Sequence, residues 1–85
     1  AYADQSGVTD LLRRALRQAR AEAERSDREE VAARVRQLIR ESGLTAAVLA
    51  SRAGTSASRL STYASGKVVP SATMMLRLER VAAEG

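Results

Sequence analysis

Helix start and stop signals follow one another so closely in the second half of this chain that only short helices fit between them. Thr45 and Ser56 are residue types that cap helix N-termini, and each precedes a short apolar segment. Gly54 can end the first segment, because glycine adopts the left-handed backbone conformation at little cost. Gly66 and Pro70 then mark a loop before the last segment. The pattern predicts helices over 45–53 and 56–64 and a final helix from residue 71 onward.

Composition favours an all-α fold. The 85 residues contain no Phe, no Trp and two Tyr, so aliphatic side chains must fill a small core. Ala, Arg and Leu, which are abundant here, are among the strongest helix formers. The absence of Cys excludes disulfides and thiolate metal sites. We therefore expect one small helical domain stabilised by aliphatic packing.

Two more helices are predicted in the first half of the chain. Residues 8–26 form an Arg-rich amphipathic helix with an apolar stripe at helical spacing. Asp27, followed three residues later by Glu30, is typical of a capping box and predicts a fresh helix start. The predicted division is a flexible N-terminus over 1–7, the Arg-rich helix over 8–26 and a main domain over 27–85.

The Arg-rich helix has several interpretations. Arg13, Arg14, Arg17 and Arg20 crowd the surface that its apolar stripe leaves free. The simplest interpretation is a solvated face. Two sharper hypotheses are a dimer-forming helix that pairs through the stripe, and an arm whose arginines contact phosphates.

Charge is unevenly distributed along the chain, whose formal net charge is +4. No acidic residue occurs between Ser42 and Leu78, although the remainder holds all 10 Asp and Glu. Acidic side chains on a surface that meets a polyanion would repel its phosphates. This window therefore indicates nucleic-acid binding more strongly than the net charge does.

The same window meets the requirements of two helices joined by a tight turn. Ala50 is small enough for the helices to approach closely, and Gly54 permits the turn. Leu60 and Tyr63, three residues apart, can anchor the second helix and leave its outer face free. The residues predicted to receive these anchors are Val48, Leu49 and Ala53.

Residues 31–83 resemble the Cro/lambda-repressor (XRE-type) helix-turn-helix family. The matching positions are Gly43-Leu44-Thr45, Leu49-Ala50, Ala53-Gly54, Ser56, Leu60, Tyr63, Ser65-Gly66-Lys67 and Pro70-Ser71. The resemblance implies a compact all-α helix-turn-helix bundle, here with an additional N-terminal amphipathic helix. Two positions depart from the family pattern. Ala46 replaces a frequent Gln that clamps a phosphate, and Ala64 replaces a usual acidic residue.

The resemblance also implies which residues meet DNA. The predicted base-contacting residues are Ala57, Ser58, Arg59, Ser61 and Thr62. The predicted phosphate-contacting residues are Thr45, Ala46, Ser56, Gly66 and Lys67, to which the charge of Arg52 is added. Arg59 can grip a guanine with two hydrogen bonds, clamp the DNA backbone or stay solvated.

The predicted function is sequence-specific binding of double-stranded DNA by a transcriptional regulator, as a repressor, with the 56–64 helix in the major groove. We expect a homodimer, formed through the first helix, the final helix or a segment outside this chain, in a bacterial cytoplasm and on the nucleoid when bound. The alternative is a protein-interaction module, an antitoxin or adaptor, built on a repurposed helix-turn-helix. Without His or Cys, we expect no catalytic residue, cofactor or metal site, and we expect no small-molecule ligand and no membrane span.

Overall fold

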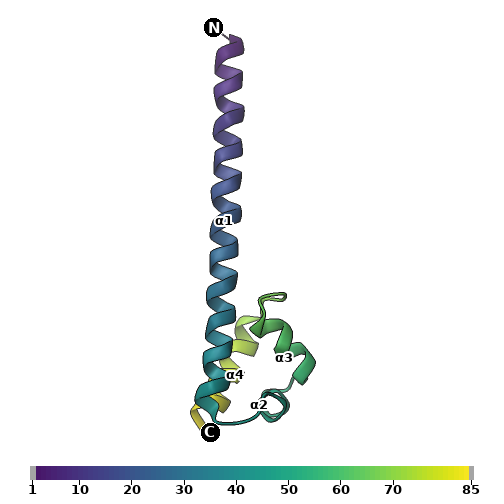
Figure 1. Ribbon diagram of the computed structural model, residues 1–85. Coiled ribbons are helices and arrows are strands. Elements are labelled where there is room, and N and C mark those ends of the chain that lie inside the picture. The colour runs from purple at the N-terminus through teal and green to yellow at the C-terminus, as the bar shows by residue number, and fades with distance from the viewer. Residues whose placement is uncertain (1, 85) are drawn as a thin grey trace.

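A long helix carries three short helices packed at its C-terminal end (Figure 1). The computed structural model describes residues 2–84, with side chains from residue 7 onward, and shows no strand in that range. The helices are α1 (Tyr2–Ser42), α2 (Ala46–Ala53), α3 (Ala57–Ala64) and α4 (Ala72–Glu84). The molecule measures 65 × 19 × 18 Å. The predicted all-α fold is confirmed. We call residues 7–28 the stem and residues 29–84 the head.

The predicted helix boundary at Asp27 is wrong. One unbroken helix, α1, runs through the expected junction, so the Arg-rich segment is not a separate helix and Asp27 is not an N-cap. Residues 21–30 contain neither Gly nor Pro, and a break there would leave backbone groups of two helix ends without partners. The predicted flexible N-terminus, residues 1–7, falls almost entirely outside the side chains that the structure describes.

The head encloses one small aliphatic core between all four helices. The largest fully buried apolar side chains are Leu38, Leu49, Leu60, Leu78 and Val35. The C-terminal part of α1 thus supplies core residues alongside α2, α3 and α4. Met74 and Met75 of α4 are partly buried and pack against this core. Val48, predicted to be buried, is 40% exposed, because the buried face of α2 is formed by Leu49, Ala50 and Ala53.

Local hydrogen bonds fix the ends of the short helices as the sequence predicts. The Thr45 and Ser56 hydroxyls accept hydrogen bonds from the Val48 and Arg59 N–H groups at 3.2 and 3.0 Å. Ser71 does the same for α4, accepting from the Met74 N–H at 3.0 Å. These side chains satisfy donors that a helix N-terminus leaves unpaired.

Arg36 joins α1 to the end of α3. One guanidinium nitrogen, Nη1, donates to the Ala64 carbonyl at 2.7 Å, and Nη2 donates to Glu29 Oε1 at 2.8 Å. Hydrogen bonds to charged groups are among the stronger ones in proteins. Arg36 therefore holds the C-terminus of α3 against the part of α1 that belongs to the head.

Candidate nucleic-acid interface

α3 has one buried face and one exposed face. Leu60 is 0% and Tyr63 6% exposed, so both anchor the helix in the head core as predicted. The residues predicted to contact bases are Ala57, Ser58, Arg59 and Ser61, all exposed, and Thr62, which is half-buried. The fold thus gathers these five residues on one short helix that is held from behind.

Tyr63 also orients the longest side chain of this helix. Its hydroxyl, at the rim of the core, accepts a hydrogen bond from Arg59 Nε at 3.3 Å. In the described part of the chain, the two terminal nitrogens of the Arg59 guanidinium make no hydrogen bond. This hydrogen bond restrains the Arg59 side chain at Nε. It leaves the two terminal guanidinium nitrogens free to donate to a planar pair of acceptors such as guanine O6 and N7.

The hydroxyl group of Thr62 already donates its proton to a hydrogen bond within α3. Thr62 Oγ1 donates to the Arg59 carbonyl at 2.6 Å, and Ser65 Oγ donates in turn to the Thr62 carbonyl at 3.2 Å. A hydroxyl retains acceptor lone pairs when its proton is used. In this conformation Thr62 can therefore accept a hydrogen bond from a base amino group.

The N-termini of α2 and α3 both present backbone donors. Thr45 and Ser56 each take up one N–H group, and a helix start leaves further N–H groups without an intrahelical acceptor, here those of Ala46 and Ala57. Neither helix has an acidic residue in its first turn. Two uncovered positive helix ends in one head suit phosphate oxygens.

The loop that carries Lys67 lies against α1 within the head. Gly66 has φ +80, and a Cβ added there would lie 3.7 Å from Ala32 Cβ of α1. The Gly66 N–H donates to the Tyr63 carbonyl at 3.3 Å, so it is already paired. The Lys67 side chain is exposed and is the group of this loop that can reach a phosphate.

Arg77 of α4 is a basic residue near the site that was not predicted as a contact. Its Nη1 lies 3.6 Å from where a Gly54 Cβ would stand, so the guanidinium lies against the turn between α2 and α3. The acid-free window contained Arg77, but only the packing of α4 behind the turn shows its position. Arg52, the remaining predicted cation, is exposed in the last turn of α2.

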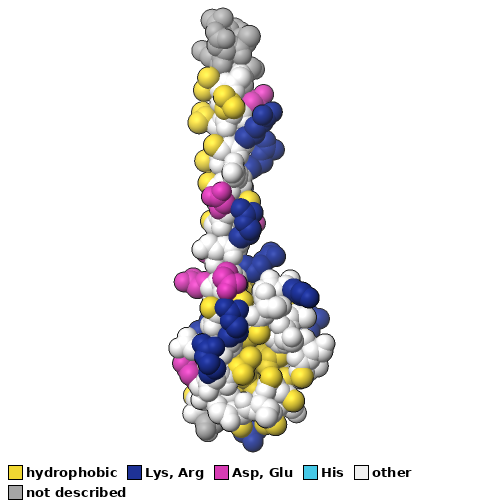
Figure 2. Space-filling model, in the orientation of Figure 1, with side chains coloured by type: hydrophobic (Ala, Val, Ile, Leu, Met, Phe, Trp, Pro, Cys, Tyr) yellow, Lys and Arg dark blue, Asp and Glu magenta, His cyan; other side chains and the backbone are white. Residues whose placement is uncertain are grey.

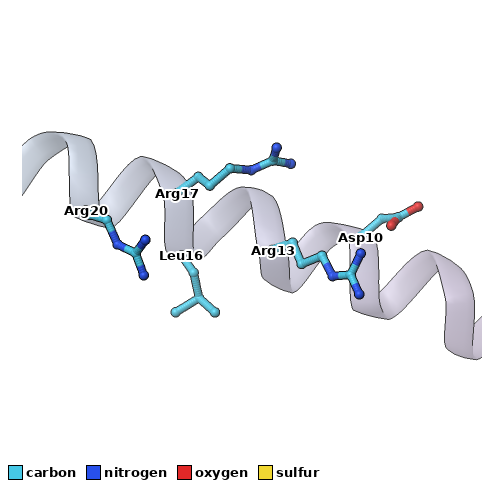
Figure 3. A pocket seen from close by; sticks show the side chains of 5 residues that line it. All are labelled: Asp10, Arg13, Leu16, Arg17 and Arg20. Atoms are coloured by element: carbon cyan, nitrogen blue, oxygen red, sulfur yellow. The ribbon is translucent and has the colours of Figure 1, made fainter.

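The stem carries a separate basic surface. Figure 2 shows arginine side chains gathered along the edge of the stem on the side of the head, and hydrophobic side chains along the opposite edge. A shallow depression on the stem is lined by Asp10, Arg13, Leu16, Arg17 and Arg20 (Figure 3). Another, at the junction with the head, is lined by Glu24, Asp27, Arg28, Val31 and Val69.

Residues 7–84 offer neither a metal-binding cluster nor a membrane-spanning helix. That range holds no group of three or more His, Cys, Asp or Glu that could bind a metal ion. Along the same stretch, no helix is both long enough and apolar enough to cross a membrane.

Comparison with known proteins gives one match. A family model described as helix-turn-helix matches residues 35–82, which is more than half of the chain and spans α2, α3 and most of α4. Neither the curated proteins nor the solved structures that were compared yield a match.

Proposed function

Since the chain belongs to the XRE-type helix-turn-helix family, a family of DNA-binding transcription regulators, we propose that it binds duplex DNA sequence-specifically, with α3 in the major groove. One observation carries this proposal. Leu60 and Tyr63 hold α3 from behind, and the helix turns its other side chains outward from a stretch of chain that has no acidic residue. Such a surface can approach phosphates without repulsion.

The predicted contacts divide by chemistry. Ala57, Ser58, Arg59, Ser61 and Thr62 are proposed to face base edges. Thr45, Ala46, Ser56, Gly66, Lys67 and Arg52 are proposed to face phosphates, and Arg77 joins them at the turn. Since most base-facing side chains are short, direct readout is limited, and we expect DNA shape to contribute to specificity.

We propose that the protein acts as a repressor and as a homodimer. Occupying a promoter needs no surface beyond the DNA-binding face, whereas activation needs a further contact. A single α3 helix offers few base contacts. Two copies, bound to half-sites about one turn of the DNA helix apart, double the number of contacts. We place this activity in a bacterial cytoplasm, because the chain has no Cys and its Arg- and Ala-rich composition suits a GC-rich genome.

Selection from a random duplex pool at physiological salt tests the proposal. We expect enrichment of a two-fold symmetric motif. Two variants sharpen the result. Ser58→Gln is expected to shift the motif, because Gln adds an amide that reads adenine. Arg40→Ala, an exposed residue in the last turn of α1, is expected to leave the motif unchanged.

The other outcomes separate the competing functions. Retention of DNA without any motif, lost as salt rises, would contradict sequence-specific recognition and leave only phosphate binding. Failure to retain DNA at any salt concentration would favour the protein-interaction module, because the acid-free surface would then have another use.

Lys67→Ala is expected to weaken binding about equally for all DNA sequences. Because each phosphate contact contributes roughly one unit to the slope of log K against log salt, the slope should become shallower by about one. Titrations of one duplex at several salt concentrations measure this slope. Lys67→Arg keeps the charge and should keep the slope. A Lys67→Ala slope equal to that of the unmodified protein would show that Lys67 does not contact a phosphate.

A further inference from the structure

The stem exposes large apolar side chains that its own chain does not cover. Val8, Leu11, Leu12 and Leu16 are 56%, 65%, 59% and 65% exposed. No side chain from residue 7 to residue 30 is buried, because the head packs only against the C-terminal part of α1. Isolated apolar residues on a surface are ordinary, but these four lie together on one side of a single helix.

Between residues 8 and 19 the apolar residues of the stem follow a seven-residue repeat, which ends where Glu22 takes the next d position. Leu12 and Ala19 take the a positions, and Val8 and Ala15 take the d positions. Leu11 and Leu16 flank this seam at g and e. Six residues thus form a continuous apolar strip over residues 8–19, in the pattern that two helices use to pack against one another.

Charged residues avoid that strip. Between residues 8 and 21, every charged side chain occupies a b, c or f position, which point away from the seam of a two-stranded coiled coil. These residues are Asp10, Arg13, Arg14, Arg17 and Arg20. The same segregation appears in Figure 2, where basic and hydrophobic side chains follow opposite edges of the stem.

The stem also lacks the usual source of helix stability. It projects from the head over roughly 30 Å, given the rise of an α-helix. Most helical stability in proteins comes from tertiary packing of an apolar face, and isolated helices are marginal in water. The apolar strip offers such packing only if another helix covers it.

We propose that a second copy of this chain covers the strip, with the two stems side by side and parallel. Leu12 then packs against Leu12 of the partner subunit, and Leu11 packs against Leu16 of the partner subunit. This inference deepens the homodimer of the proposed function and rests on that function for its purpose, since parallel stems bring both heads to the same end of the dimer.

Two interchain ion pairs favour an identical, parallel partner, although Glu22 takes the d position just after the strip and would face Glu22 of the partner subunit. Glu29, at the next d position, is already paired with Arg36 of its own chain. In this register Arg25, at a g position, faces Glu30 of the partner subunit at an e position, and symmetry repeats the pair on the other side. The arginines of the two stems stay on outer positions, where their like charges lie far apart and in water. An antiparallel arrangement centred on the strip would lose the Arg25–Glu30 pairs, because residue 25 would lie beyond the apolar segment of the partner.

A single cysteine tests both the pairing and its direction, because the chain has none of its own. Ala19→Cys places a thiol at an a position. In a parallel pair the two thiols face each other across the seam, within reach of a disulfide. Ala21→Cys is the matched control, two residues along the same helix at an outer position. Without DNA and under mild oxidation, we expect Ala19→Cys to become mostly a disulfide-linked dimer and Ala21→Cys to stay unlinked.

Sedimentation of both reduced variants completes the test, and a dimer is expected for each. A monomer at micromolar concentration would overturn the proposal. A dimer in which Ala19→Cys links no better than Ala21→Cys would overturn the parallel stem pairing in favour of an antiparallel one or of another surface. Because no DNA is present, failure here leaves the selection of a DNA motif intact. Conversely, a linked dimer that selects no motif would contradict the proposed function alone.

Discussion

Replacement of Leu60 by Ala is expected to lower the free energy of unfolding by about 2–5 kcal/mol. Leu60 is 0% exposed and belongs to the single core cluster of the head. Its neighbours there are mainly closely packed aliphatic side chains, several of them short alanines. Such side chains cannot rearrange to fill the cavity that the lost atoms leave. Chemical denaturation followed by circular dichroism, at one protein concentration, measures the change.

Leu76→Ala is the matched control for this substitution. Leu76 lies on α4 and is 45% exposed, so its removal should leave no comparable cavity. We expect a loss below about 1 kcal/mol. Equal losses for the two variants would show that Leu60 does not anchor α3 in the core of the head.

Arg59→Ala is expected to weaken binding to the selected DNA motif by about 1–3 kcal/mol, which is roughly a 5- to 150-fold rise in Kd. The guanidinium fork is free in the head, while its Nε is held by Tyr63. An arginine restrained in this way is suited to grip guanine with two hydrogen bonds. Binding titrations with the motif and with duplexes that replace each guanine in turn measure the effect.

The pattern of losses identifies the role of Arg59. If it reads a guanine, the variant should no longer distinguish the duplex that lacks this guanine from the full motif. Weakening that is uniform across all duplexes would make Arg59 a phosphate contact and contradict base reading. Arg40→Ala removes the same charge from the last turn of α1 and should change neither affinity nor preference by comparable amounts.

The ends of the short helices could be predicted because local chemistry determines them. A capping hydroxyl and a left-handed glycine each satisfy or terminate one helix end using only neighbouring residues. Thr45, Gly54 and Ser56 therefore act in the structure as their types suggest. The periodicity of α3 likewise predicted which of its residues are buried, since Leu60 and Tyr63 lie one turn apart.

Features that depend on competition or on distant packing could not be predicted in the same way. A cap such as Asp27 contributes only about 1 kcal/mol, which does not outweigh an uninterrupted ladder of helical hydrogen bonds. The contacts of Arg36 with Ala64 and of Arg77 with the Gly54 turn join segments far apart in sequence. No local pattern marks such contacts. The structure gives the position of each residue that was predicted to contact DNA, whereas the role of each in binding stays a prediction.

Because α1 is one unbroken helix, the number of residues in the stem sets the angle about the helix axis between the apolar strip and the head. Each residue of an α-helix turns the chain by about 100°, so one inserted residue near Asp27 would rotate the apolar strip by that angle relative to Val35 and Leu38. Seven inserted residues would bring it back to within about 20°. The number of residues between Leu16 and Val35 therefore sets the direction in which α3 faces relative to the apolar strip. Relatives with longer or shorter stems can preserve that direction only by changing length in numbers of residues that close nearly whole turns, as about 7 or about 11 residues do.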